Sequence, residues 1–134
     1  MLDQICIVDD DPIFIYTTKR TIKLSKISAS LLVFFDGKEA YDSLLKMADE
    51  NQELPDLILL DINMPVWDAW TFLDKFTVRD FGKRIVIYVV SSSINKADTE
   101  KAKDYKDVEN YLIKPISVEE LEDAVSEDFP DMNL

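Results

Sequence analysis

Asp61 ends a short apolar run at residues 57–60, and a proline follows at position 65. An apolar run of this length between turn residues is typical of a strand buried on both faces. Ligands of open α/β sheets bind at the carboxyl ends of such strands. The sequence therefore places a carboxylate where chemistry is expected, although an aspartate here could also simply cap the next turn.

Four further polar residues follow apolar runs in the same way. Asp9 and Asp10 follow residues 4–8, Ser91 follows residues 84–90, and Lys114 follows residues 110–113. Each has an ordinary structural explanation when taken alone, as part of a helix cap, a turn or a loop. Their joint placement at strand ends favours a functional site, because parallel strands deliver their carboxyl ends to one edge of a sheet.

These residue types suit one kind of chemistry. Three converging carboxylates repel each other, and a hard divalent cation such as Mg²⁺ would relieve that repulsion. A carboxylate beside such a cation can attack phosphorus, so Asp61 is the candidate nucleophile. Lys114 would supply a cation to a phosphoryl oxygen and Ser91 a hydroxyl donor. The set can accept a phosphoryl group.

The elements that must position these residues alternate along the chain. We predict strands at residues 4–8, 29–35, 57–61, 84–90 and 110–113, and helices at 13–25, 38–47, 70–76, 95–105 and 118–125. Alternation of this kind predicts a parallel α/β sheet with right-handed connections, without fixing the strand order. We expect one domain over residues 1–134, with a core at about 4–127 and a frayed acidic tail at 128–134.

Composition excludes several classes of function. The net charge of −12 argues against nucleic acid or an anionic membrane as a partner. The absence of histidine removes His-based catalysis and most zinc sites. The single cysteine, Cys6, lies in an apolar run, so no disulfide framework is expected. Apolar runs are too short for a membrane helix and no signal peptide is evident, so we expect a cytoplasmic protein.

The acidic residues concentrate at the C-terminal end. Seven of them follow Ile116, where no Lys or Arg occurs. A docking surface and a solvated helix face both explain this segment.

Four motifs together resemble the receiver domain of bacterial two-component response regulators, over residues 5 to about 125. They are Val8-Asp9-Asp10, the run Leu60-Asp61-Ile62-Asn63-Met64-Pro65, a hydroxyl at Ser91, and Lys114-Pro115. The resemblance implies a flavodoxin-like (βα)5 three-layer sandwich with a five-stranded parallel sheet in the order 2-1-3-4-5. It also implies a stand-alone, single-domain receiver.

The resemblance assigns a role to each site residue. Asp61 would be phosphorylated, and Mg²⁺ would bind Asp10 and Asp61 directly, Asp9 mainly through water, and the backbone carbonyl of Asn63. Lys114 would contact the phosphoryl group and Ser91 would move toward it. Tyr111 matches the aromatic switch residue of the family, although it could also be an ordinary core tyrosine.

The family also implies partners. Phosphorylation would remodel the surface formed by the helix at 95–105, the strand at 110–113 and the last helix, where a downstream protein would bind. The donor would be a sensor histidine kinase or a histidine phosphotransfer protein, because this chain has no histidine. We expect a monomer or weak dimer that catalyses only its own phosphorylation and dephosphorylation.

Two other functions remain open at this point. An Asp-nucleophile phosphatase would use similar residues, but its signature has a second Asp two positions after the nucleophile, where this chain has Asn63. A scaffold receiver that is never phosphorylated is disfavoured because all five site residues are present. Ser92 is a weaker alternative to Ser91, and Asp11 is a weaker metal ligand than its neighbours.

One departure from the family pattern affects the loop after Asp61. The family often has Asp-Gly there, and this chain has Asp68-Ala69, so a residue suited to positive φ is missing. The geometry of that loop is not predictable from the sequence.

Overall fold

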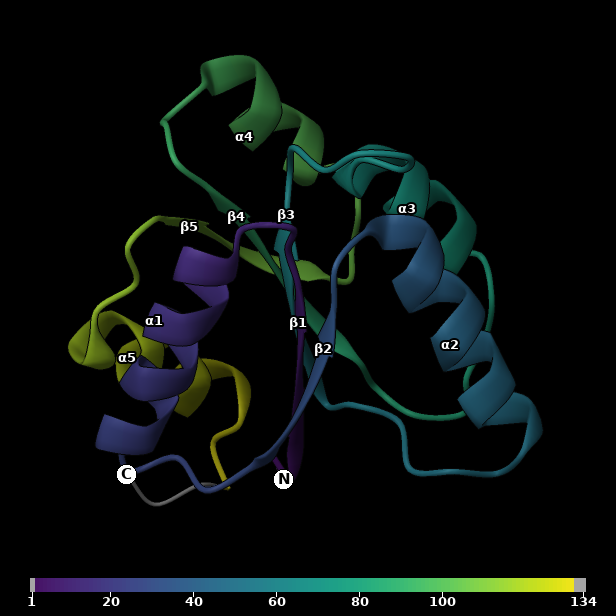
Figure 1. Ribbon diagram of the computed structural model, residues 1–134, viewed down its shortest axis with the longest axis horizontal. Coiled ribbons are helices and arrows are strands. Elements are labelled where there is room, and N and C mark those ends of the chain that lie inside the picture. The colour runs from purple at the N-terminus through teal and green to yellow at the C-terminus, as the bar shows by residue number, and fades with distance from the viewer. Residues whose placement is uncertain (1, 132–134) are drawn as a thin grey trace.

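Strands and helices alternate throughout the computed structural model, which describes residues 2–131 (Figure 1). The strands are β1 (Gln4–Val8), β2 (Ser30–Phe34), β3 (Leu57–Asp61), β4 (Val86–Ser91) and β5 (Val108–Ile113). The helices are α1 (Pro12–Leu24), α2 (Gly37–Asp49), α3 (Ala69–Phe76), α4 (Lys96–Ala102) and α5 (Val118–Asp128). The predicted alternation is confirmed, with most boundaries moved by one to three residues.

All five strands are parallel and form one sheet in the order β2-β1-β3-β4-β5. This is the flavodoxin-like order that the family resemblance implied. Strands β1 and β3 are neighbours, with Val8 opposite Leu60, and this is where the strand order reverses. Asp9 follows β1 and Asp61 ends β3, so both lie at the position where open α/β sheets bind ligands.

The sheet is covered on both faces, as Figure 1 shows. Helices α1 and α5 pack on one face, and α2 and α3 pack on the other. Side chains alternate between the two cores along each central strand, so Ile5 and Ile7 join the first core while Cys6 and Val8 join the second. Two buried faces explain why the central strands are continuously apolar in sequence.

A side-chain oxygen caps the N-terminus of each of these helices. In each case the oxygen accepts a hydrogen bond from a backbone N–H in the first turn, which would otherwise lack a partner. The caps, from α1 to α5, are Asp11, Asp36, Asp68, Asn95 and Ser117. Local capping chemistry therefore sets where every helix begins.

Helix α4 is the least embedded of the five. It has seven residues, of which only Ala102 is buried, and it stands at the edge of the molecule in Figure 1. The predicted helix at 95–105 was too long, because the chain leaves the helix at Lys103 and turns through Tyr105 before β5. None of the helices in residues 2–131 has the length and apolar character needed to cross a membrane.

The C-terminal segment differs from the frayed tail expected from residue 128. Asp128 ends α5 and accepts a hydrogen bond from the Tyr88 hydroxyl at 2.6 Å. Phe129 is buried in the first core, with the Arg84 guanidinium over its ring. An aromatic anchor therefore orders the chain beyond the expected boundary. Residues 132–134 of the expected tail lie outside the described residues.

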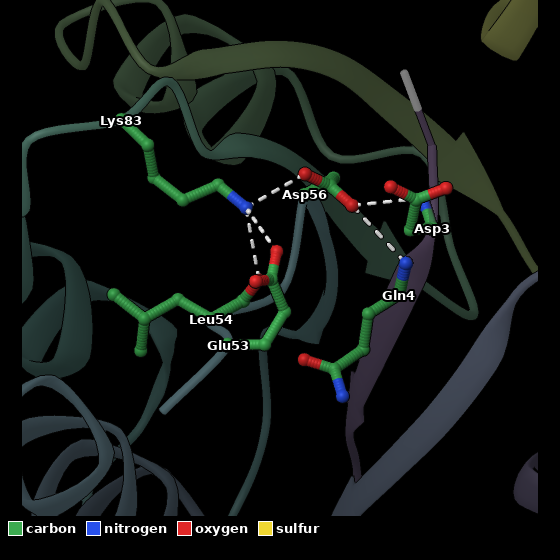
Figure 2. Close-up of polar contacts among 6 residues, drawn as sticks. All are labelled: Asp3, Gln4, Glu53, Leu54, Asp56 and Lys83. Carbon is green, nitrogen blue, oxygen red and sulfur yellow. Dashed lines mark hydrogen bonds and ion pairs between the residues drawn. The ribbon is translucent and has the colours of Figure 1, made fainter. Parts of the chain in front are cut away.

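A polar cluster ties the strands together at the edge opposite Asp61 (Figure 2). The Asp56 carboxylate, directly before β3, accepts hydrogen bonds from the backbone N–H groups of Asp3 and Gln4 and from Lys83 Nζ at 2.7 Å. Burial pushes the Asp56 pKa up, but Lys83 and the two N–H donors outweigh it and leave the pKa below its ordinary value. The cluster joins β1, β3 and the segment before β4.

Candidate functional site

Three carboxylates meet at the carboxyl edge of the sheet. Asp9 and Asp10 follow β1, Asp61 ends β3, and ligand oxygens of the three lie within 4.8 Å of one another. Asp9 is fully buried and Asp61 nearly so, whereas Asp10 is exposed. The neighbouring positions of β1 and β3 in the sheet produce this convergence.

Lys114 is the cation of the site. Its Nζ lies 2.9 Å from Asp9 Oδ2 and 3.3 Å from Asp61 Oδ1, and 4.4 Å from the centre of the Phe14 ring. Its backbone N–H donates to the Ser91 carbonyl at 2.8 Å, which fixes the loop after β5 to the end of β4. Burial lowers the Lys114 pKa, but the two carboxylates outweigh this and raise the pKa above its ordinary value.

One lysine does not neutralise the three acids. The pKa of Asp61 is raised to about 6, first by burial and then by the negative charge of Asp9, and Lys114 opposes both effects only in part. Burial also raises the Asp9 pKa, despite Lys114 and the Asp11 N–H group. The site therefore holds more negative charge than its own cation balances.

The donor set fits a hard divalent cation. All three acids offer carboxylate oxygens, the ligand type that Mg²⁺ and related ions prefer. Asp9 Oδ2 is buried and, within residues 2–131, accepts no hydrogen bond, its contact with Lys114 being an ion pair. Lys114 supplies one positive charge against three carboxylates, so a divalent cation would add the charge that the site lacks.

Asp11 is separated from this group by its role in α1. Its carboxylate accepts a hydrogen bond from the Ile13 N–H at 3.0 Å and caps the helix, and its own N–H donates to Asp9 Oδ1 at 2.8 Å. The third acid of the run therefore orients Asp9 and begins α1.

The loop at residues 62–68 carries Asn63, which is exposed. The positive φ in this loop falls on Val66, at 68°, and not on Ala69, which is fully buried at the start of α3. The loop packs closely on α2, since a Cβ on Gly37 would lie 3.0 Å from the Trp67 carbonyl oxygen. The alanine in place of the family glycine is therefore accommodated within the helix.

Ser91 and Tyr111 are connected through Ser93. Ser91 is buried at the end of β4, and its hydroxyl accepts a hydrogen bond from the Ser93 N–H at 3.2 Å. The half-buried Tyr111 donates from its hydroxyl to the Ser93 carbonyl at 3.4 Å. Among the described hydrogen bonds, the Ser91 hydroxyl thus contacts its own loop and not Asp61, while Ser92 is exposed.

Phe14, whose ring contacts the Lys114 ammonium, is not among the site residues predicted from the sequence. Phe14 lies on the buried face of α1. Nothing in the sequence distinguishes it from any other apolar residue on that face, so only the fold reveals its position at the site.

Comparisons with known proteins identify the family of this chain. The family model described as "Response regulator receiver domain" matches residues 5–126. Response regulator Rcp1 of Synechocystis is 30% identical over 118 residues, which is 87% of this chain and 80% of Rcp1. Transcriptional regulatory protein PrrA of Mycobacterium tuberculosis is 32% identical over 118 residues, 88% of this chain but only 46% of PrrA. The chain thus spans about half the length of PrrA.

Solved structures agree as well. A two-component response regulator from Cytophaga hutchinsonii has a TM-score of 0.87 at 23% identity, over 97% of this chain and 98% of that one. The Mn²⁺-bound form of Rcp1 has a TM-score of 0.77 at 26% identity, over 98% of both chains. On the family match, the relatives and the fold, this chain belongs to the response regulator receiver domain family of two-component signalling.

Proposed function

We propose that Asp61 accepts a phosphoryl group from a phosphohistidine of a partner protein in a reaction that requires Mg²⁺. The observation that carries this proposal is the convergence of a nearly buried Asp61 with two further acids and Lys114 at one sheet edge. Membership of the receiver family supports it. Residues 1–134 act as one receiver domain.

The metal in this proposal is Mg²⁺. Asp10 and Asp61 bind it directly, Asp9 through water, and the backbone carbonyl of Asn63 completes the protein ligands. Support comes from the three carboxylates, which face a single lysine, and from Rcp1, a relative with a Mn²⁺-bound structure. Bound Mg²⁺ supplies positive charge to phosphoryl oxygens.

The remaining steps belong to residues of this chain. A carboxylate oxygen of Asp61 forms the new bond to phosphorus as the bond from phosphorus to the donor imidazole nitrogen breaks, and the imidazole then takes a proton from solvent. The raised Asp61 pKa means that the nucleophilic anion predominates only above about pH 6 in the free protein. Lys114, already 3.3 Å from Asp61, holds a phosphoryl oxygen.

The signal leaves the site through Ser91 and Tyr111. The Ser91 hydroxyl leaves Ser93 and donates to the phosphoryl group, and Tyr111 repositions because it shares Ser93 as a partner. Helix α4, strand β5 and helix α5 then present an altered surface to a downstream protein. The weak embedding of α4 suits it to this movement.

The donor is a sensor histidine kinase or a histidine phosphotransfer protein, because the chain has no histidine of its own. Catalysis is confined to phosphorylation and dephosphorylation of Asp61. An Asp-nucleophile phosphatase gains no support, since the exposed Asn63 amide cannot replace the second aspartate as a general acid.

Intact-protein mass spectrometry with Mg²⁺ and acetyl phosphate tests this function. We expect wild type to gain the mass of one phosphoryl group, and Asp61→Asn to gain nothing. Chelation of the metal with EDTA should also abolish the gain. An unmodified wild type, or an adduct that persists in Asp61→Asn, would show that Asp61 is not the acceptor.

A further inference from the structure

Helices α1 and α5 lie side by side on one face of the sheet and carry opposite charges (Figure 1). The contact is direct, because the Thr21 hydroxyl of α1 donates to the Ile116 carbonyl just before α5. Helix α1 contains three cations and no acid, whereas α5 contains six acids and no cation. Charge is therefore segregated across this surface in a chain whose net charge is −12.

The outward face of α1 is both basic and apolar. Opposite its buried residues lie three large apolar side chains, Ile13, Tyr16 and Leu24, with exposed fractions of 73%, 56% and 65%. Arg20 and Lys23 project between them and form no ion pair within residues 2–131. Exposed apolar side chains gathered on one helix face indicate a contact surface.

A groove borders this face on the side of the edge strand β2. It has a volume of about 530 Å³. Pro12, Tyr16, Lys19, Arg20, Lys23 and Phe35 contribute to its walls. An apolar floor with a basic rim fits a partner that is itself acidic.

The outward face of α5 is such an acidic surface. Leu121, Ala124 and Val125 are buried against the core, which leaves the exposed acids on the opposite side. These are Glu119, Glu120, Asp123 and Glu127. The acidic face of α5 and the basic face of α1 thus belong to the same layer of the same molecule.

Symmetry determines how two such surfaces can meet. Both helices run against the direction of the parallel strands, so they are parallel to each other. A two-fold axis that runs between α1 and α5, parallel to them, sets α1 of one copy on α5 of the other, twice over. A two-fold axis across the helices would instead set α1 on α1 and α5 on α5, with like charges opposed.

We propose that the α1–α5 face binds a second copy of this chain, with the basic face of α1 set against the acidic face of α5 in both directions. The contact covers the exposed apolar residues of α1 and pairs its cations. It also accounts for the concentration of acids at the C-terminal end of the sequence.

The net charge of the chain opposes this association and makes it weak. Two copies of charge −12 repel at long range, but at physiological ionic strength that repulsion is screened beyond about 8 Å. Contacts between the facing helices lie within that distance. We therefore expect association at high protein concentration and not at trace levels.

Sedimentation velocity of the full chain up to millimolar concentration, at physiological salt, tests the proposal. Wild type should show a sedimentation coefficient that rises with concentration from monomer toward dimer. Arg20→Glu/Lys23→Glu should stay monomeric, because both facing helices are then acidic. Glu119→Lys/Glu120→Lys/Asp123→Lys/Glu127→Lys, which reverses all four exposed acids of α5, should also stay monomeric, because the outward faces of both helices are then basic, even though this variant has a smaller net charge.

An equimolar mixture of the two charge-reversed variants is the decisive measurement. Opposite charges face each other in the mixed pair alone, so the mixture should form dimers although neither variant does. Lys46→Glu/Lys106→Glu is the control. It reverses two exposed cations outside the α1–α5 face and changes the net charge as much as Arg20→Glu/Lys23→Glu does, so it should associate nearly as wild type does. Circular dichroism verifies that every variant is folded. A monomeric wild type, association unaffected by either reversal, or a monomeric mixture would overturn the proposal.

Discussion

Asp56 and Asp61 stand at the two ends of β3, and their surroundings shift their pKa values in opposite directions. Asp56 accepts three hydrogen bonds and its pKa is lowered. Asp61 shares one lysine with Asp9, and its pKa is raised to about 6, first by burial and then by the charge of Asp9. The two carboxylates are five residues apart and differ in reactivity, because the oxygens of Asp56 are engaged in hydrogen bonds and those of Asp61 are not fully engaged.

Asp61→Asn should stabilise the metal-free protein above pH 6. The folded-state pKa of Asp61 is about 6, above its ordinary 3.8. As pH rises from 3.8 to 6, the Asp61 carboxyl loses its proton in the unfolded state before it does so in the folded state. The free energy of unfolding of wild type therefore falls by up to about 3 kcal/mol, whereas the asparagine variant has no such loss. Urea unfolding in EDTA at pH 8 and pH 3.5 measures the difference. An equal effect at both pH values would contradict it.

Millimolar Mg²⁺ should raise the melting temperature of wild type, because a ligand that binds only the native state stabilises it. Asp10→Asn should abolish the rise, since Asp10 is one of the three converging acids. Asp11→Asn is the matched control, because Asp11 caps α1 and asparagine also caps helices. A Mg²⁺ response retained in Asp10→Asn would count against this metal site.

Asp56→Asn should destabilise the protein by roughly 2–3 kcal/mol at neutral pH, because it leaves Lys83 without its closest carboxylate. The stability that Asp56 provides is present above its unfolded pKa and is lost as pH falls through its lowered folded pKa. Asp42→Asn, which breaks the exposed Lys38–Asp42 pair, should leave the free energy of unfolding nearly unchanged. Chemical denaturation of both variants gives the comparison.

Phe14→Leu should slow phosphorylation of Asp61 by acetyl phosphate about fivefold, because leucine has no aromatic face for the Lys114 ammonium. A contact of this type contributes about 1 kcal/mol. Phe14→Tyr keeps the ring and should retain most of the rate. Time-resolved mass spectrometry well below the melting temperature separates this effect from lost packing. Equal rates for the leucine and tyrosine variants would exclude it.

Val66→Asn should stabilise the protein by about 1 kcal/mol. Val66 has a φ of 68°, which disfavours a β-branched residue and which asparagine tolerates. Its side chain is 73% exposed, so little packing is lost. Val78→Asn is the control, since Val78 is also highly exposed but its φ is not positive. The melting temperature should rise above that of wild type in Val66→Asn and fall below it in Val78→Asn.

The sequence predicted the alternation of elements and the positions of the strand ends, because both follow from local periodicity. The central strands are recognisable because burial on both faces makes them continuously apolar. The strand order required the family resemblance, since nothing local specifies which strands pair.

Other features depend on contacts between distant residues. Lys83 donates a hydrogen bond to Asp56, which is 27 positions away in the sequence. The Phe14 ring contacts Lys114 at the carboxyl edge of the sheet. Phe129 is ordered by the first core and by Arg84 rather than by any local signal. The positive φ at Val66 could not be foreseen either, because valine is a poor residue for that conformation.

The cluster around Asp56 also determines the direction in which the molecule can respond to a new charge. Since Lys83 and the first residues of β1 hold the amino ends of the strands in fixed register, β1 and β3 cannot slide past one another. Strain that arises at Asp61 therefore cannot travel down the sheet axis. It must spread sideways through the loops that follow β3, β4 and β5.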